Sequence, residues 1–371
     1  MRIVYFTHSL VSCWNHGNAH FQRGVLRELV RRGHDVVAWE PSSGWSRRNL
    51  VRDHGLAPLA RFRAAFPELD TRLYGPQPDV DAMLAGADLV IVHEWTDPAL
   101  VAAIGRARLR YGRFVLLFHD SHHRAASSPA DMRALNLSGY DGVLAFGEAI
   151  AEIYRDWGWG DRVHVWHEAA DVRLFRPPMP GDDGKRSGIV WIGNWGDGER
   201  SAELVNFLLR PAATAELPVA VHGVRYPEHA LATLAANGAD YRGWLPNADV
   251  PGVFARHAAT IHVPRRFYAE QLPGIPTIRV FEALASGIPL VCAPWQDSEG
   301  LFTPGRDYLV ARNEGEMRAT LTALAADADL RRFLVRNGLR TIRARHTCGH
   351  RVDELLSIVG NLLQQSARGA A

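Results

Sequence analysis

The sequence has almost no lysine. Lys185 stands alone among 42 basic residues, and all the others are arginines. This excludes Schiff-base catalysis and Walker-type phosphate binding, because Lys185 lies in an Asp-Asp-Gly-Lys-Arg segment that lacks the spacing of a P-loop. A coding bias explains the shortage better than nucleic-acid binding does, since acidic residues are interspersed with the arginines and the net charge is only +2. We therefore expect no nucleic-acid partner.

Cysteines and long apolar runs are also scarce. The three cysteines, Cys13, Cys292 and Cys348, lie far apart and form no Cys-x-x-Cys pair, which favours buried thiols over a metal or redox centre. No apolar run approaches the roughly 18 residues that a membrane helix needs, so we expect no integral membrane segment. The first six residues are typical of a strand and not of a signal peptide, and a cytoplasmic location is the expectation.

The 371 residues are enough for two domains, and a content of 47% hydrophobic and 22% charged residues is typical of globular proteins. Short apolar runs alternate with amphipathic helical patterns in the first half. The expected strands are residues 2–6, 35–39, 88–92, 113–118, 142–145 and 162–165, and the expected helices are 19–32, 98–110 and 148–156. This order predicts an α/β fold with a doubly wound, mostly parallel sheet.

A second alternating block follows a segment rich in proline, glycine and aspartate, residues 175–187, which predicts a linker. The expected strands are 188–192, 219–222, 259–263 and 288–292, and the expected helices are 199–209, 227–236, 277–285, 314–345 and 351–365. These patterns predict an N-terminal Rossmann-like domain at 1–177, a C-terminal Rossmann-like domain at 186–345 and a final helix within 346–371. They do not indicate an oligomeric state.

The most informative stretch is residues 273–292. Pro273 and Gly274 open it, a helix and Gly287 follow, and a short buried strand completes it. Glu282 lies in the middle of the helix between apolar residues, where a carboxylate needs a partner. A helix N-terminus can hold phosphates, and the carboxylate can accept hydrogen bonds from ribose hydroxyls. The stretch therefore predicts a phosphorylated ligand that carries hydroxyl groups.

This stretch resembles the donor-binding segment of GT-B glycosyltransferases of the group 1 (GT4-like) superfamily, and it is most similar to their spore-maturation-protein-like (CgeB-like) branch. The resemblance implies two Rossmann-like domains that face a central cleft. It also implies retaining, metal-independent transfer from a nucleotide-diphosphate sugar, with Glu282 on the nucleotide ribose. The broad family carries another glutamate eight positions earlier for the donor sugar, but this sequence has Gly274 there.

Other residues of the second half are candidates for the donor site. The turn at Gly193 and Asn194 follows a strand and leads to Arg200 at a helix start, which predicts a pyrophosphate cradle or else an ordinary helix-start turn. Arg279 shares a helix face with Glu282 and either binds phosphate or pairs with that glutamate. The predicted donor-binding residues are Gly193, Asn194, Arg200, Arg266, Gly274, Ile275, Thr277, Arg279 and Glu282. The segment 295–307 either lines the cleft or is a solvated loop.

Two loops of the first half also follow expected strands. The loop 7–20 holds three histidines and two asparagines, of which residues 15–18 could cap the next helix. The residues predicted on the acceptor side are His16, Gly17, Asn18 and His20, with a capped surface turn as the alternative.

The second loop follows residues 116–118. His119 matches by position a family histidine, and the resemblance implies that it contacts the donor sugar, while Asp120 could orient a ring nitrogen or bind a hydroxyl. We take these two as the catalytic candidates. Three histidines and an aspartate also raise a metal site, but His122 and His123 are consecutive and no outlying ligand has a clear spacing, so we expect no metal.

The sequence thus predicts a hexosyltransferase-type enzyme that uses a nucleotide-diphosphate sugar as co-substrate, needs no cofactor and glycosylates an acceptor that the sequence does not identify. A GT-B sugar-nucleotide epimerase is one alternative, and it would need acidic residues in the cleft. A non-catalytic sugar-nucleotide-binding protein is another, because the glutamate is missing at Gly274. A nicotinamide oxidoreductase is disfavoured, since no Gly-x-Gly-x-x-Gly follows a strand.

Overall fold

The computed structural model describes residues 1–178, 186–196 and 198–369. Lys185 and most of the predicted linker at 175–187 lie outside these ranges. The chain forms two compact units, the first from Met1–Glu168 together with Cys348–Ala371 and the second from Ala169–Thr347. The C-terminal helix therefore belongs to the first unit, and the units divide after residue 168, whereas the sequence pattern put the boundary after residue 177.

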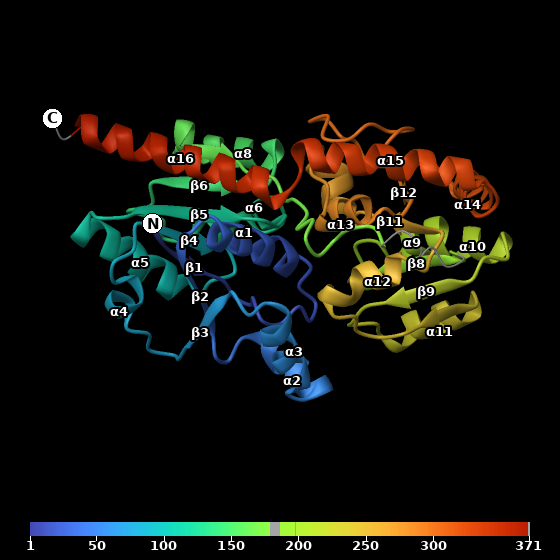
Figure 1. The fold of residues 1–371 in the computed structure, drawn as a ribbon, viewed down its shortest axis with the longest axis horizontal. Helices are drawn as coiled ribbons and strands as arrows, with labels where there is room; N and C mark the ends of the chain where they lie inside the picture. Colours follow the sequence, from blue (N-terminus) through green and yellow to red (C-terminus); the bar gives the residue numbers. More distant parts are fainter. Residues whose placement is uncertain (179–185, 197, 370–371) are drawn as a thin grey trace. The chain divides into compact units, whose positions relative to one another are not determined.

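The first unit contains a parallel seven-stranded sheet in the order β3-β2-β1-β4-β5-β6-β7 (Figure 1). Its strands are β1 (Arg2–Phe6), β2 (Asp35–Pro41), β3 (Asp70–Tyr74), β4 (Leu89–His93), β5 (Val115–Asp120), β6 (Gly142–Ala145) and β7 (Val163–Val165). The order reverses at β1, so the carboxyl ends of β1 and β4 form a topological switch point, where such sheets bind ligands. Sequence patterns missed β3, because its mostly exposed Asp-Thr-Arg-Leu-Tyr has no apolar alternation.

Helices surround this sheet at the places that the chain order dictates. They are α1 (Ala19–Arg31), α2 (Trp45–His54), α3 (Ala57–Ala65), α4 (Val80–Leu84), α5 (Pro98–Tyr111), α6 (Arg124–Ser127), α7 (Pro129–Arg133), α8 (Glu148–Tyr154) and α16 (Cys348–Gly369). A π-helical turn (Arg155–Trp159) and a 3₁₀ turn (Gly160–Arg162) follow α8. Helix α1 buries Phe21, Val25 and Leu29 at helical spacing, as its pattern predicts.

The last helix completes the first unit. Helix α16 packs against α1 and β5, and Figure 1 shows its red ribbon beside α1. Val352, Leu355 and Val359 are buried on one face, and the Trp166 indole donates a hydrogen bond of 2.8 Å to the Arg351 carbonyl. The final segment of the chain therefore stabilises the N-terminal sheet, which a reading by chain order alone did not anticipate.

The second unit repeats the plan with a parallel six-stranded sheet in the order β10-β9-β8-β11-β12-β13. Its strands are β8 (Ile189–Ile192), β9 (Val219–His222), β10 (Ala239–Tyr241), β11 (Ala259–His262), β12 (Leu290–Cys292) and β13 (Leu309–Val310). The order reverses at β8, so β8 and β11 form the switch point. Both units are thus Rossmann-like, doubly wound sheets, as the sequence predicts.

The helices of the second unit are α9 (Ser201–Leu204), α10 (Arg210–Thr214), α11 (Glu228–Ala236), α12 (Val250–Phe254), α13 (Ile278–Ser286), α14 (Glu314–Ala326) and α15 (Ala328–Arg345). π-Helical turns lie at Val205–Leu209 and Phe267–Gln271, and a 3₁₀ turn lies at Asn247–Asp249. The segment 314–345 is helical as expected, but it forms two helices. Asp327 has an extended backbone, and its carboxylate accepts hydrogen bonds from the first amides of α15, which starts the second helix.

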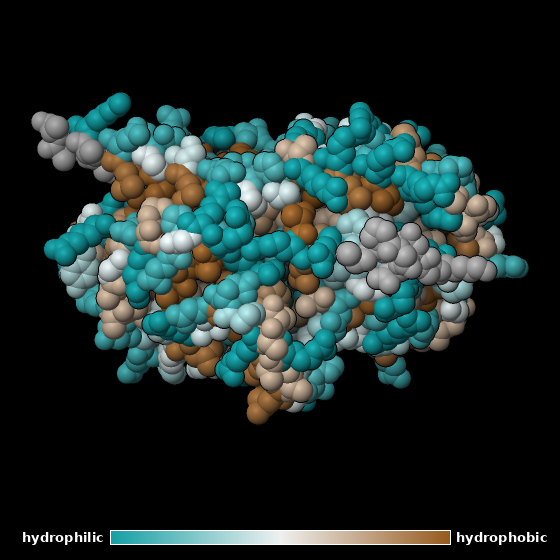
Figure 2. All heavy atoms as spheres, viewed as in Figure 1, coloured by the Kyte–Doolittle hydropathy of each residue, from teal (hydrophilic) through white to brown (hydrophobic). Residues whose placement is uncertain are grey.

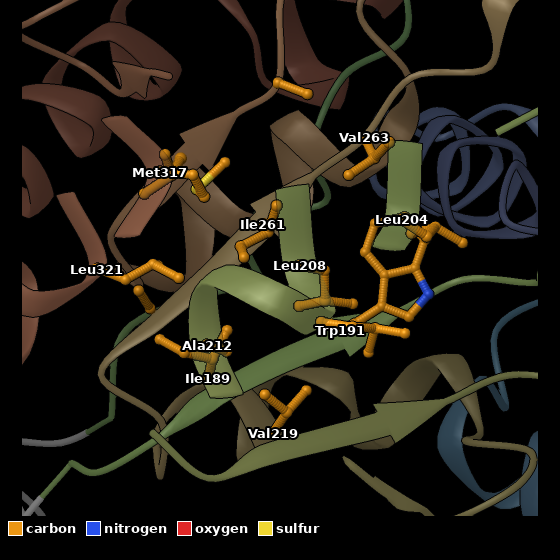
Figure 3. Close-up of a cluster of buried hydrophobic side chains, with 14 of the residues drawn as sticks. Ile189, Trp191, Leu204, Leu208, Ala212, Val219, Ile261, Val263, Met317 and Leu321 are labelled. Atoms are coloured by element: carbon orange, nitrogen blue, oxygen red, sulfur yellow. The ribbon is translucent and has the colours of Figure 1, made fainter. Parts of the chain in front are cut away.

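A continuous apolar core lies under the second sheet. Figure 3 shows Trp191 of β8 beside Leu204 and Leu208, with Ile261 of β11 and Met317 of α14 further along the same cluster. All five side chains are buried. This core fixes the inner faces of β8 and β11, and so the positions of the loops that follow them.

The face of the molecule in Figure 2 is mostly hydrophilic, and apolar side chains appear there in separate groups. Among the described residues, no helix combines the length and the apolar composition that crossing a membrane requires.

Candidate functional site

The switch point of the second unit is shaped by glycine backbones. Gly193 and Asn194 follow β8, and the Gly193 amide donates a hydrogen bond of 2.9 Å to the carbonyl of His222, the last residue of β9. A Cβ atom on Gly223 would collide with the Gly193 carbonyl, so the two chain segments approach as closely as backbones allow. The predicted turn is therefore held in one shape by its neighbour.

Arg200 spans this switch point. Its Nη2 donates to the Asn194 carbonyl at 3.0 Å and to Oδ1 of that residue at 2.7 Å, and its Nη1 donates to the Val263 carbonyl after β11 at 3.2 Å. The guanidinium also lies over the Trp191 ring, 5.1 Å from its centroid. Burial, with Arg265 nearby, lowers the pKa of Arg200 to about 10, so the group stays charged at neutral pH. All these acceptors are uncharged, and among the described residues no carboxylate forms an ion pair with Arg200.

Several buried polar atoms around Arg200 have no hydrogen-bond partner among the described residues. They are Nε of Arg200, Nε of Arg279, Nε1 of Trp195 and Nδ1 of His262. Burial lowers the pKa of His262 to about 3, with smaller effects from Arg200 and Arg279, so this ring is neutral. Buried donors without acceptors are rare in native proteins, and a group of them beside a cation indicates a site for an anion.

Two further arginines after β11 are paired with acidic side chains. Arg265 donates to Glu199 at 2.7 Å, and its Nη2 lies 3.4 Å from Asn194. Arg266 donates to Glu203 at 3.0 Å and to the Gly198 carbonyl at 2.6 Å, and nearly half of its side chain is exposed. Arg265 thus belongs to the switch point. Arg266 lies at the surface, and its predicted contact with the nucleotide sugar is untested.

Helix α13 brings Glu282 into a polar contact network. The carboxylate is fully buried, Arg279 donates to its Oε2, and Asn247 donates to its Oε1 at 2.9 Å. The salt bridge that the sequence left as an alternative is therefore present. The ribose contact of Glu282 stays a prediction, and Asn247, which lies 35 residues earlier, had no signal in the sequence.

The start of α13 holds the remaining donor candidates. Thr277 immediately precedes the helix, and its Oγ1 lies 3.2 Å from Nε2 of His262. Ile275 is fully buried, and its predicted contact with the donor is untested. Gly274 has a φ of +88°, a left-handed conformation that explains why the residue is a glycine. Its amide donates to the Gln296 carbonyl at 2.8 Å.

The switch point of the first unit gathers histidines. The His8 ring, after β1, lies 4.2 Å from His16 and 5.5 Å from His93, the last residue of β4. Burial lowers the pKa of His8 to about 4 and that of the other two rings well below the usual value, so the cluster is uncharged. Trp95 follows on the same loop, 45% exposed, with the Arg124 guanidinium 4.2 Å above its ring. The three histidine rings therefore offer polar atoms and apolar surface but carry no charge.

His119 and Asp120, the predicted catalytic pair, are both fully buried. The Tyr5 hydroxyl lies 2.8 Å from Nδ1 of His119, and Trp166 packs on the ring, while Nε2 has no hydrogen-bond partner among the described residues. Burial lowers the pKa of His119 to about 3. Asp120 accepts from the Tyr154 hydroxyl at 2.9 Å and from the His122 amide at 3.1 Å. Both side chains support the loop after β5, and their predicted contact with the sugar is untested.

The acceptor-side candidates lie at the start of α1. Asn18 precedes the helix, but its side chain does not cap it and instead donates to Ser121 Oγ at 3.0 Å and to the Ser121 carbonyl at 2.9 Å. The Asn18 side chain therefore does not supply the expected cap, because it ties the loop after β1 to the loop after β5. Gly17 is half-buried beside it, and His20 is buried on α1.

Sequence reasoning missed His93, Glu94 and Trp95. His93 ends β4, and Glu94 and Trp95 follow it. The His-Glu-Trp run at a predicted strand end is the signal that could have identified them. Glu94 is buried, its Oε2 lies 3.6 Å from Arg124, and burial together with Asp120 raises its pKa well above the usual value. The described parts of the chain contain no group of three or more His, Cys, Asp or Glu side chains arranged to hold a metal ion.

We expect the melting temperature to fall as the pH drops from 6.5 to 4. Unfolded histidines take up a proton near pH 6.5, whereas folded His8 and His119 do so only at about 4 and about 3. The unfolded state binds more protons in this window, so stability that is present above pH 6.5 is lost below it. Melting curves of the wild type and of His119→Gln, recorded across this pH range, separate the contribution of His119 from that of carboxylates that titrate in the same range. An identical pH dependence of the two proteins would contradict this account.

Two protein-family models match the chain. The model described as Glycosyltransferase Family 4 matches residues 20–174, and the model described as Glycosyl transferase-like matches residues 200–357. The first match lies in the first unit except for its last six residues, 169–174, and the second match includes both Arg200 and Glu282. No curated protein matches the sequence.

Solved structures with a similar fold are numerous. Alr3699/HepE from Anabaena in complex with UDP has a TM-score of 0.68 at 14% identity, with 97% of this chain and 100% of that chain covered. An alpha-glucosyltransferase in complex with UDP and a 13-mer DNA containing an HMU base has a TM-score of 0.68 at 12% identity, covering 97% and 99%. A glycosyltransferase from Rickettsia africae has a TM-score of 0.67 at 10% identity, covering 98% of both chains. Such likeness confirms the predicted fold class, an α/β chain of two Rossmann-like domains of the GT-B type.

Proposed function

We propose that this GT-B glycosyltransferase, which has a glycosyltransferase family domain in each half, transfers a hexosyl group from a nucleotide-diphosphate sugar to a hydroxyl acceptor. The acceptor oxygen forms the new bond to the anomeric carbon and releases its proton. The bond to the diphosphate oxygen breaks, and the nucleoside diphosphate leaves. Retention of anomeric configuration and a place in the CgeB-like branch are part of the proposal, and so is a cytoplasmic location.

The observation that carries the proposal is the group of unsatisfied donors around Arg200. Nε of Arg200, Nε of Arg279 and Nε1 of Trp195 are buried without acceptors among the described residues. A diphosphate supplies anionic oxygens for these atoms and a counter-charge for Arg200. As the sugar bond breaks, negative charge grows on the leaving phosphate, so donors placed here stabilise the transition state more than the ground state.

The nucleotide is proposed to be uridine diphosphate in the first instance. Alr3699/HepE was solved with UDP, with UDP and glucose, and with UDP-glucose, and the alpha-glucosyltransferase was solved with UDP. In our proposal Glu282 accepts from the ribose hydroxyls after exchanging a contact with Arg279 or Asn247. His16, Asn18 and neighbouring residues of the first unit are proposed to meet the acceptor, and His119 to reach the sugar through Nε2.

The test is product analysis by NMR with UDP-glucose, with and without candidate acceptors. A transferase releases UDP and forms a glycoside or, in slow hydrolysis, free glucose. The raised pKa of the buried Asp120, about 6, is the one observation that favours a sugar-nucleotide epimerase, because it provides an acid near neutral pH. Conversion of the donor to its epimer without release of UDP would replace our proposal with that function.

We expect turnover to survive removal of metal ions. Arg200 and its neighbours supply positive charge and directed donors at the proposed diphosphate site, which is the role a divalent cation plays elsewhere. Turnover is measured in excess EDTA and again after Mg²⁺ or Mn²⁺ is restored. Activity that disappears with EDTA and returns with either ion would show that a metal takes part.

A further inference from the structure

The backbone at Gly274 leaves no room for a side chain. With φ at +88°, a Cβ atom there would lie 2.5 Å from Oγ of Ser298 and 2.9 Å from Cγ of Glu299. It would also lie 3.1 Å from Oε1 of Glu299. A glutamate, which the resemblance led us to expect at this position, would be strained by the positive φ and would displace the side chains of Ser298 and Glu299. The side chain of Glu299 lies in the space into which it would extend.

The loop that carries Glu299 is fastened in place. The Gly274 amide donates to the Gln296 carbonyl at 2.8 Å, and this bond joins the loop to the segment that precedes α13. The Asp297 carboxylate closes the loop by accepting from the Leu301 amide at 3.0 Å and from the Phe302 amide at 2.7 Å. Glu299 itself is half-buried, and its side chain lies beside the Gly274 backbone. Because hydrogen bonds hold this loop, a side chain on it loses little conformational entropy when it binds a ligand.

The charge of Glu299 defines what it can bind. A carboxylate only accepts hydrogen bonds, and next to a diphosphate it would repel the phosphate oxygens. It can accept hydrogen bonds from hydroxyl groups, and the sugar of the donor carries such groups. We propose that Glu299 is the residue that recognises the hydroxyls of the donor sugar. It lies on a different loop from Gly274, but its side chain lies beside the position where the broad family carries a glutamate for this purpose. This inference rests on the proposed function of the second unit.

The test compares Glu299→Ala and Glu299→Gln with the wild type in calorimetric titrations against UDP, UDP-glucose, UDP-galactose and UDP-N-acetylglucosamine. Glu270→Ala is the matched control, because Glu270 is an exposed glutamate in the turn just before Gly274. We expect Glu299→Ala to bind UDP within about twofold of the wild type and to bind the preferred sugar nucleotide about tenfold to a hundredfold more weakly. Glu299→Gln keeps the shape of the side chain and should lose less.

The outcomes separate the two proposals. A wild type that binds none of the four probes contradicts the uridine nucleotide donor of the proposed function. A wild type that binds them, with Glu299→Ala retaining the full preference for a sugar nucleotide over UDP, overturns the role of Glu299 alone. An equal loss of affinity for UDP and for its sugars in both Glu299 variants also overturns that role, since it would show a general disturbance of the site.

Discussion

Arg200→Met should lower affinity for the nucleotide diphosphate about a hundredfold and turnover at saturating donor by about a hundredfold to a thousandfold. Two charge-assisted hydrogen bonds to phosphate, each worth about 1.5 kcal/mol at the lower end of their usual range, account for the loss in binding. The loss in turnover is larger because the leaving diphosphate gains charge in the transition state. Calorimetric titration with UDP and initial rates of UDP release measure the two effects.

The substitution also removes internal contacts, so its effect on folding has to be separated. Arg200 donates to Asn194 and Val263, and their oxygens lose a donor in the variant. Melting curves record that cost. Arg242→Met is the matched control, because Arg242 is an exposed arginine that directly follows β10 and pairs with Asp240 at 2.7 Å. Unchanged affinity for UDP in a folded Arg200→Met protein would show that the diphosphate does not bind at this switch point.

Glu282→Gln should weaken donor binding about tenfold to a hundredfold. The amide keeps the shape of the side chain but loses the charge that strengthens hydrogen bonds from two ribose hydroxyls. The structure adds a second consequence: the Arg279 guanidinium loses its carboxylate partner in a buried setting, so the melting temperature should also fall. Titration with UDP and melting curves of the variant record both.

A matched control distinguishes ligand binding from pair breaking. Glu28→Gln removes the carboxylate from a pair with Arg31 on α1, which has the same three-residue spacing and lies in the first unit. It should lower the melting temperature and leave UDP binding unchanged. If Glu282→Gln behaves in the same way, Glu282 serves only the fold.

Sequence patterns predicted the elements whose residues are periodic. Residues 2–6, 142–145 and 219–222 form strands with the predicted bounds, because continuous apolar runs between turn residues are typical of buried parallel strands. Helices α2 and α3 were missed, since α2 is rich in arginine and buries few residues. The place of α16 on the first sheet was also missed, because it depends on contacts such as Trp166 with Arg351, which are 185 residues apart.

The site was predictable to the level of its loops. Parallel sheets bind ligands beyond strand ends, so loops after β1, β5 and β8 could be chosen from the sequence. The partners of each side chain could not. Arg200 meets Val263 and Asn247 meets Glu282 only because β8 and β11 lie side by side and α13 packs near the turn at residue 247. The contact between Gly274 and Glu299 is of the same kind, and no local pattern encodes it.

The most direct test of the central claim is a thermal-shift panel of UDP-glucose, GDP-glucose, TDP-glucose and ADP-glucose, with UMP and free glucose as controls. A ligand that binds only the folded state stabilises it by mass action, by about 2.7 kcal/mol at a hundred times its Kd, and so raises the melting temperature. Our account predicts that at least one nucleotide-diphosphate sugar raises the midpoint well beyond UMP or glucose, and that Arg200→Met abolishes the difference. Midpoints that no diphosphate sugar changes, or that UMP raises equally, would contradict it.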